Sequence, residues 1–224
     1  MEAFPDEKLP PFSALSYACG NEAPTTSIIC NGKTIYVTPH LYSALRTIVN
    51  LGCAANIWVA ATCLNQRDNA EKSIQVPKMA TIYRTANNVL AWLGPAGEDS
   101  DLVIDQSRID QISSAASVIQ GQVAYSKLVE SRLPGFMDPF WPALGKLCQL
   151  AWFFRLWVVQ EIALGRENFM ICGERMVFYD SLAMMMRHLT RLGCTNLMRG
   201  TAERGQQDQV AGLTILAVHT LIRQ

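Results

Sequence analysis

Three adjacent polar side chains, Asn65, Gln66 and Arg67, form the first group in this 224-residue sequence whose types could do chemistry. They follow shortly after an apolar run at residues 57–61. The two amides could hydrogen-bond a nucleotide or a sugar, and the guanidinium could bind a phosphate. Alternatively, Asn65 bonds its own backbone to form a turn, and Gln66 is a solvated loop residue. The residues alone leave both interpretations open.

Glu161 is the second candidate, because helical spacing places it on one face with aromatic side chains. It follows Phe154 by seven positions and Trp157 by four, which brings the three side chains together on a helix. A carboxylate desolvated among aromatic rings in a cleft is a candidate general acid or base. The alternative, which we favour, is a buried ion pair or a helix-capping contact with Arg84 or Arg155.

Neither cysteines nor histidines form a metal-binding pattern. The sequence has seven cysteines, at positions 19, 30, 53, 63, 148, 172 and 194. The number is odd and no Cys-x-x-Cys pair occurs, which argues against a disulfide framework and a zinc site. We expect most of them to be buried thiols. The three histidines, at positions 40, 188 and 219, show no metal or nucleophile spacing, so we expect no metal and no cofactor.

The charge balance excludes a global electrostatic attraction to nucleic acid or to an anionic membrane. Nineteen basic and nineteen acidic residues cancel, and such partners usually bind a basic surface. No secretory signal is visible at residues 1–11, and no apolar stretch reaches the length of a spanning helix. Half of the residues are hydrophobic, enough for a sizeable core. We expect a soluble, cytoplasmic protein.

Apolar runs separated by helical segments predict an α/β fold with a mostly parallel sheet. The runs at residues 14–18, 57–61 and 89–93 are interpreted as strands, the second of them covered on both faces. Segments long enough for helices separate the runs. Because such crossovers place strands side by side and parallel, we expect all three strands to be neighbours in one sheet.

Turn residues predict two β-hairpins added to this sheet. Residues 27–37 contain Asn31-Gly32, a dipeptide typical of tight turns between strands. Gly173-Glu174 lies between two short apolar runs in the same way. Helices are predicted at residues 39–49 with Thr38 as the cap and at 69–86 divided by Pro77, and one or two surface helices are predicted within 99–130. Further helices are predicted at 140–164 broken near Pro142, at 180–192 capped by Asp180 or Ser181, and at 210–222.

Four segments resemble the fungal heterokaryon-incompatibility (HET) domain, in the order in which that family has them. They are residues 13–20, 56–66, 75–94 and 152–161. The residues that match the family pattern are Ser16, Tyr17, Gly20, Trp58, Cys63, Gln75, Tyr83, Trp92, Gly94, Trp157 and Gln160. Three positions depart from it: Cys19 replaces a Trp, and Asn21 and Ala60 each replace an Asp.

The resemblance implies a TIR-like or flavodoxin-like sheet and two classes of function. The first is a non-self recognition and cell-death signalling module in a fungus, which binds a protein partner or itself. The second is a TIR-like enzyme that hydrolyses NAD as its substrate through Glu161. Because the acidic positions are lost at Asn21 and Ala60, the sequence favours the first class, in a degenerate form without catalysis.

The same resemblance divides the chain into three parts. Residues 1–11 are an N-terminal extension, and residues 12–192 are the HET-like domain with a variable helical insertion at about 96–138. Residues 193–224 are a C-terminal tail with a helix.

Overall fold

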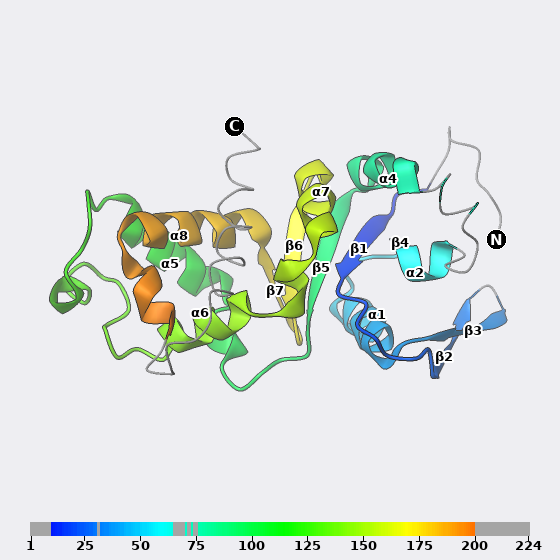
Figure 1. Cartoon of the computed structure of the whole chain (residues 1–224), viewed down its shortest axis with the longest axis horizontal. Helices are drawn as coiled ribbons and strands as arrows, with labels where there is room; N and C mark the ends of the chain where they lie inside the picture. The colour runs from blue at the N-terminus through cyan, green and yellow to red at the C-terminus, as the bar shows by residue number, and fades with distance from the viewer. Residues whose placement is uncertain (1–9, 31, 65–69, 71–72, 74–75, 200–224) are drawn as a thin grey trace.

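A five-stranded sheet runs through the molecule in the order β4-β1-β5-β6-β7 (Figure 1). The computed structural model describes residues 10–199 except 31, 65–69, 71–72 and 74–75. The strands are β1 Ser13–Tyr17, β4 Ile57–Trp58, β5 Asn88–Gly94, β6 Asn168–Cys172 and β7 Arg175–Phe178. β4, β1, β5 and β6 pair in parallel, and β7 pairs with β6 antiparallel. The predicted α/β class and the neighbouring parallel strands are therefore confirmed.

The predicted strand at residues 57–61 is shorter than expected. β4 ends at Trp58, and the helix α2, Ala60–Cys63, begins two residues later. Consecutive alanines have the highest helix propensity of all residues and are depleted in strands. β4 also pairs with β1 alone at the edge of the sheet and is half-buried, so the expectation that it is covered on both faces is wrong.

Both predicted hairpins are present. β2, Thr26–Cys30, and β3, Lys33–Val37, pair antiparallel in a small sheet of their own. Gly32, in the turn between these two strands, has a positive φ of 72°, the conformation that a tight turn requires. The second hairpin joins β6 and β7 through Gly173, whose φ is also positive.

Helices cover both faces of the sheet, and α1 lies on the opposite side of β1 from α4 (Figure 1). α1, Pro39–Leu51, begins as predicted, because the Thr38 hydroxyl accepts a hydrogen bond from the N–H of Leu41 at 3.1 Å. The predicted division at Pro77 separates the short 3-10 helix η1, Val76–Lys78, from α4, Met79–Thr85. The rest of the helix predicted from residue 69 lies largely outside the described residues.

The second half of the chain is mostly helical, and several boundaries differ from prediction: of the stretch predicted at 99–130 only residues 106–117 form an α-helix, and the stretch at 140–164 is interrupted between residues 148 and 156. The α-helices are α5 Gln106–Ser117, α6 Phe140–Cys148, α7 Leu156–Leu164 and α8 Tyr179–Arg191, and the 3-10 helices are η2 Ser100–Leu102, η3 Tyr125–Lys127, η4 Ala151–Phe154 and η5 Cys194–Arg199. Pro142 lies in the first turn of α6, where no N–H bond is needed, so the predicted break near it is wrong. α8 begins at Tyr179 with Phe178 at the cap, ahead of the predicted caps.

The core consists of two buried clusters, one on each face of the sheet. Ala14 and Ala91 face the large cluster formed with α4 to α8. Their chain neighbours Leu15 and Leu90 face the smaller cluster formed with α1. This alternation follows from the period of two along a strand. None of the helices in the described part of the chain could cross a membrane; the helix predicted at 210–222 lies outside that part.

Candidate functional site

The carboxyl ends of β1 and β5 lie side by side at the point where the strand order reverses. From β1 the chain crosses through α1 to β4 at one edge, and from β5 it continues toward β6 in the other direction. Open parallel sheets bind ligands outside this point. The paired residues at the end of the two strands are Tyr17 and Trp92. The fold therefore predicts a site here.

A buried polar network joins Glu161 on α7 to this end of β1. The hydroxyl of Ser16 donates a hydrogen bond to Oε2 of Glu161, and Nε1 of Trp152 donates to the hydroxyl of Ser16 at 2.8 Å. Nη2 of Arg155 lies 3.5 Å from Oε1 of Glu161. Both carboxylate oxygens therefore have a partner inside the protein, and Glu161 is 2% exposed.

Each residue of this network is placed by the element that carries it. Ser16 alternates with Leu15 and therefore faces α7 and not α1. Arg155 is the residue that caps α7, and Glu161 follows one and a half turns later on the inner side of the helix. The ion pair is the one that we favoured from the sequence, and its arginine is Arg155 and not Arg84.

Tyr83 on α4 connects the network to Trp58 in β4. Its ring meets the Trp58 ring edge to face, with centroids 5.7 Å apart, and its hydroxyl donates to the carbonyl of Leu15 at 3.3 Å. Burial raises the pKa of Tyr83, and the negative charge of Glu161 raises it further. The hydroxyl therefore stays a protonated donor at neutral pH.

Three aromatic rings lie on the α1 side of the same strand ends. The His40 ring stacks on Tyr17 at 6.2 Å between centroids and lies tilted 6.4 Å from Trp92. Gly94 ends β5 with a φ of 123°, and a Cβ added there would meet Cε1 of His40 at 4.0 Å. The backbone N–H of His40 donates to a carboxylate oxygen of Glu22 at 3.2 Å, which fixes the backbone of His40 at the first turn of α1.

Comparison with known proteins identifies the family of this chain. The family described as "Heterokaryon incompatibility protein (HET)" matches residues 12–161. The chain belongs to the HET family. A similar relative is "Heterokaryon incompatibility protein 6, OR allele" of Neurospora crassa, which is 27% identical over 226 residues, covering 87% of this chain and 33% of that protein. The chain thus spans about a third of the length of this relative. No solved structure matches it.

The HET-motif residues divide into those that meet at the strand ends and those that do not. Ser16, Tyr17, Tyr83, Trp92 and Gly94 lie together there, and Trp58 contacts Tyr83. Gly20 follows in the loop after β1 with a positive φ, and Cys63 ends α2 half-buried. Asn65, Gln66, Arg67 and Gln75 lie outside the described residues, so the structure does not test the predicted ligand-binding run.

Sequence reasoning missed part of the site. Trp152 contributes a donor to Ser16, and His40 stacks on Tyr17, yet neither was a candidate. For His40 a signal existed, because the start of the helix after β3 was predicted and such a start in a parallel α/β sheet lies near strand ends. For Trp152 no local pattern indicates a partner 136 positions away.

Apolar residues on nearly all sides of the helix that carries Trp157 predict that its side chain is largely buried, and this prediction is wrong. Trp157 is 49% exposed and Leu156 is 84% exposed, whereas Val158 and Ile162 are fully buried. The helix is apolar on nearly all sides, but the protein covers only the side toward α4 and the sheet. Gln160, the remaining motif residue, is half-buried.

Trp157→Ala should therefore lower the free energy of unfolding by only about 1–2 kcal/mol, because half of the side chain is already in water. Urea denaturation of the purified HET domain measures this change. Val158→Ala on the same helix is the matched buried control and should cost about 2–3 kcal/mol. A loss of more than about 3 kcal/mol for Trp157→Ala would contradict the exposed position.

The positions that depart from the HET pattern lie on the surface or near it. Cys19 and Asn21 are exposed in the loop after β1, and Ala60 is half-buried at the start of α2. All seven cysteines lie in the described part of the chain and are free, but only three of them are buried. The expectation that most are buried is wrong. Among the described residues no cluster of His, Cys, Asp and Glu could hold a metal ion.

Ala60→Asp should change the free energy of unfolding by less than about 0.5 kcal/mol. A carboxylate at the first residue of α2 lies at the positive end of the helix dipole, which offsets partial burial. A thermal melt measures the effect, with Ala44→Asp in the buried face of α1 as a control that should unfold the domain. A loss above about 2 kcal/mol for Ala60→Asp would show that the position is enclosed.

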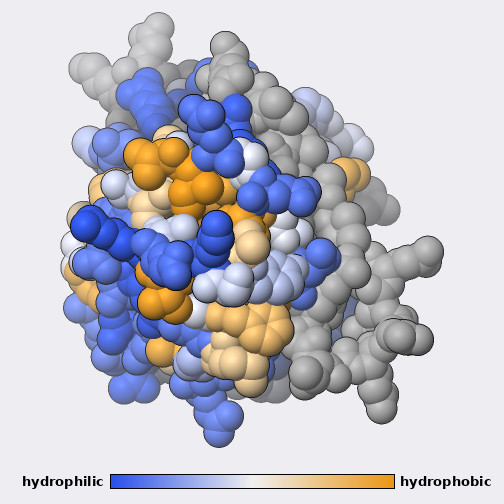
Figure 2. Space-filling view, turned by 90° about the vertical axis from the view of Figure 1, so that its left-hand side faces the viewer, coloured by the Kyte–Doolittle hydropathy of each residue, from blue (hydrophilic) through white to orange (hydrophobic). Residues whose placement is uncertain are grey.

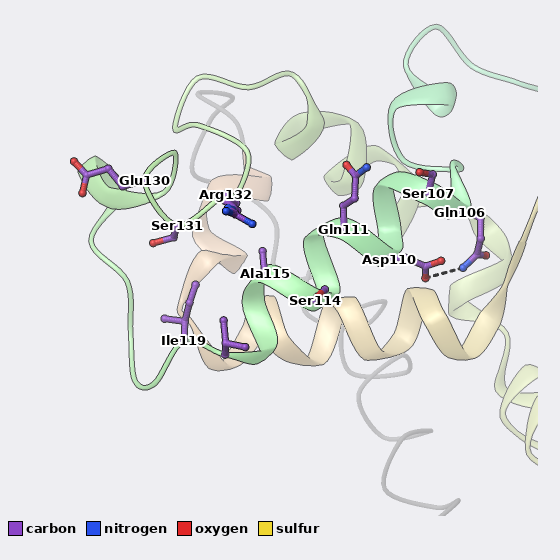
Figure 3. Close-up of a pocket in the computed structure, with 11 residues that line it drawn as sticks. Gln106, Ser107, Asp110, Gln111, Ser114, Ala115, Ile119, Glu130, Ser131 and Arg132 are labelled. Atoms are coloured by element: carbon purple, nitrogen blue, oxygen red, sulfur yellow. Dashed lines mark hydrogen bonds between the residues drawn. The ribbon is translucent and has the colours of Figure 1, made fainter.

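A groove of about 1230 Å³ lies away from these strand ends, between α5 and residues 130–132 (Figure 3). Polar side chains line it together with the apolar Ala115, Val118 and Ile119, and Gln106 donates to Asp110 across one helical turn at 2.9 Å. The neighbouring face of the molecule carries separate apolar groups interrupted by hydrophilic ones (Figure 2). None of the candidate residues lines this groove.

Proposed function

We propose that this HET domain is a module of fungal heterokaryon incompatibility, which takes part in non-self recognition and signals cell death by binding a protein partner. The family match and the Neurospora relative named for incompatibility support this role. The seven free cysteines fit a reducing compartment, which supports a cytoplasmic location.

The exposed apolar face of α7 is the observation that carries the proposal. Phe154, Leu156 and Trp157 are all exposed there on consecutive turns of η4 and α7. Aromatic side chains exposed beside aliphatic ones are typical of surfaces that bind proteins, and Trp is enriched among the residues that dominate such binding. The proposed contact surface is therefore formed by these three residues, which we call the α7 face.

The network around Glu161 supports a structural role for this carboxylate. Both of its oxygens have partners inside the protein, and burial separates it from solvent. The NAD-hydrolysing alternative requires a carboxylate that reaches a substrate, and no described contact of Glu161 favours it. In the proposal, Glu161 fixes the inner side of α7 so that its outer side is presented rigidly to the partner.

The test is induced expression in a filamentous fungus, with viable cells counted after induction. We expect the wild-type domain to reduce viability, and Leu156→Ser/Trp157→Ser to restore it to within a few-fold of uninduced cells. Ile29→Ser, at an 81% exposed position on the β2–β3 hairpin, is the matched control and should stay toxic. Sedimentation velocity on the same proteins distinguishes self-association from binding of another protein.

Two results would overturn the proposal. If the double variant is as toxic as the wild type, the α7 face is not the contact surface. If expression of the wild-type domain leaves the number of viable fungal cells unchanged, the domain does not signal cell death on its own.

A further inference from the structure

The helical turn before Leu133 ends at an arginine in a conformation that usually belongs to glycine. Arg132 has a φ of 58°, and no other non-glycine residue in the described part of the chain has a positive φ. The N–H of Leu133 donates to the carbonyl of Leu128, and the N–H of Arg132 donates to that of Val129, the two bonds of a Schellman motif. Glycine is the usual residue at this position, because a side chain there is strained. The arginine therefore has a cost that the turn itself does not require.

The side chain of Arg132 points toward α5 in the groove described above (Figure 3). It is exposed, and none of the described carboxylates forms an ion pair with it. Two carboxylates line the groove: Asp110 accepts a hydrogen bond from Gln106, and Glu130 points away from α5 (Figure 3). The groove therefore contains a cation without a charge partner, held there by a strained backbone of the kind found at functional sites.

The lining of the groove changes along α5. Gln106 and Asp110 lie at the start of the helix, and Val118 and Ile119 directly follow its end, with Arg132 opposite the stretch between them (Figure 3). Val118 is 80% exposed, so the apolar end is uncovered. The 12 residues of α5 span about 18 Å. The groove thus combines a polar end, a central cation and an apolar end along one helix.

Hydroxyl and amide side chains in the groove favour an extended ligand. Ser107, Gln111 and Ser114 on α5 line it, and hydroxyls and amides both donate and accept hydrogen bonds. An extended segment has backbone N–H and C=O groups free for such partners, whereas a helix has already bonded its own. At about 3.3 Å per residue, roughly six extended residues cover the length of α5. We propose that this groove binds an extended segment of a protein partner, whose acidic side chain pairs with Arg132 and whose aliphatic side chain packs on Val118.

The groove and the α7 face are separate surfaces. α5 lies at the end of the molecule beyond β7, whereas α7 lies beside β5 and β6 (Figure 1). The inference therefore does not depend on the α7 face, and peptide binding in the groove is measured independently of cell viability.

The experiment measures binding of the purified full chain to an array of hexapeptides with capped ends. One fixed position is glutamate or glutamine, a second is leucine or serine, and the others are varied at random. We expect the peptides that bind to carry both glutamate and leucine. Replacing glutamate by glutamine in the best of them should weaken binding by about tenfold, the usual effect of one lost hydrogen bond between charged groups.

Arg132→Gly removes the cation and leaves a residue that suits the backbone. Because glycine relieves the strain, we expect a melting temperature equal to or above that of the wild type, together with loss of the preference for glutamate. Arg132→Asn, the other residue common at this position, should behave in the same way. Lys127→Ala is the matched control, since Lys127 is exposed in the same turn but does not line the groove, and should bind the best peptide within twofold of the wild type.

Three results would overturn the proposal. The first is an array in which no binding depends on glutamate. The second is a preference for glutamate that persists in both folded Arg132 variants. The third is a wild-type dimer in sedimentation velocity that Arg132→Gly dissociates, which would assign the groove to a second copy of this chain instead of a different protein.

Discussion

Replacing Glu161 by alanine should lower the free energy of unfolding by about 3 kcal/mol. The change leaves the guanidinium of Arg155 without its charge partner and the hydroxyl of Ser16 without its acceptor, both inside the protein. Removing one partner of a buried ion pair typically costs about 3–5 kcal/mol, and the lower end applies because the Arg155 side chain is 28% exposed. Urea denaturation measures the loss.

Two further variants show whether charge or hydrogen bonding is responsible. Glu161→Gln keeps an oxygen that accepts from Ser16 and removes only the charge, so we expect it to cost about half as much. Glu167→Ala, three residues after the end of α7 and exposed, should cost less than about 0.5 kcal/mol. Equal stability of Glu161→Ala and the wild type would mean that the network contributes nothing to folding.

Gly145→Ala should also cost about 3 kcal/mol, although alanine is the better helix former by about 1 kcal/mol. A Cβ at Gly145 in α6 would lie 2.2 Å from the carbonyl oxygen of Met198 in η5, and a backbone atom cannot turn away as a side chain can. Overpacking of this kind typically costs about 1–3 kcal/mol, and the rigid backbone partner places it at the upper end.

Gly97→Ala is the control for this prediction, since nothing lies within 4 Å of the added methyl group. It should leave the melting temperature within a degree or two of the wild type. A stabilised Gly145→Ala protein would show that η5 can separate from α6 at little cost.

The sheet was predictable because its signals are local. Apolar runs of strand length and helix-length crossovers between them are sufficient to predict parallel neighbours. The errors arose where tertiary context decides. Ala60 and Ala61 look like the end of a strand until one knows that β4 is at the edge, and Trp157 looks buried until one knows that only one side of α7 is covered.

The site was predictable only where its partners are close in sequence. Arg155 and Glu161 are six positions apart, so their ion pair was among the alternatives. Ser16 is 145 positions from Glu161, and no pattern in a single sequence connects residues at that distance. The position of Arg132 opposite α5 depends on the packing of the loop that carries it, which periodicity does not describe.

The separation between Ser16 and Glu161 has a consequence during synthesis. A ribosome adds about 5–20 residues per second, so the 145 residues between them take on the order of ten seconds. In the second half of that time β1 and β5 have been made, but β6, which covers the open edge of β5, has not. Unpaired strand edges bind other chains readily. The nascent protein therefore passes through a period in which protection by chaperones matters most. This period ends only when α7 and β6 emerge.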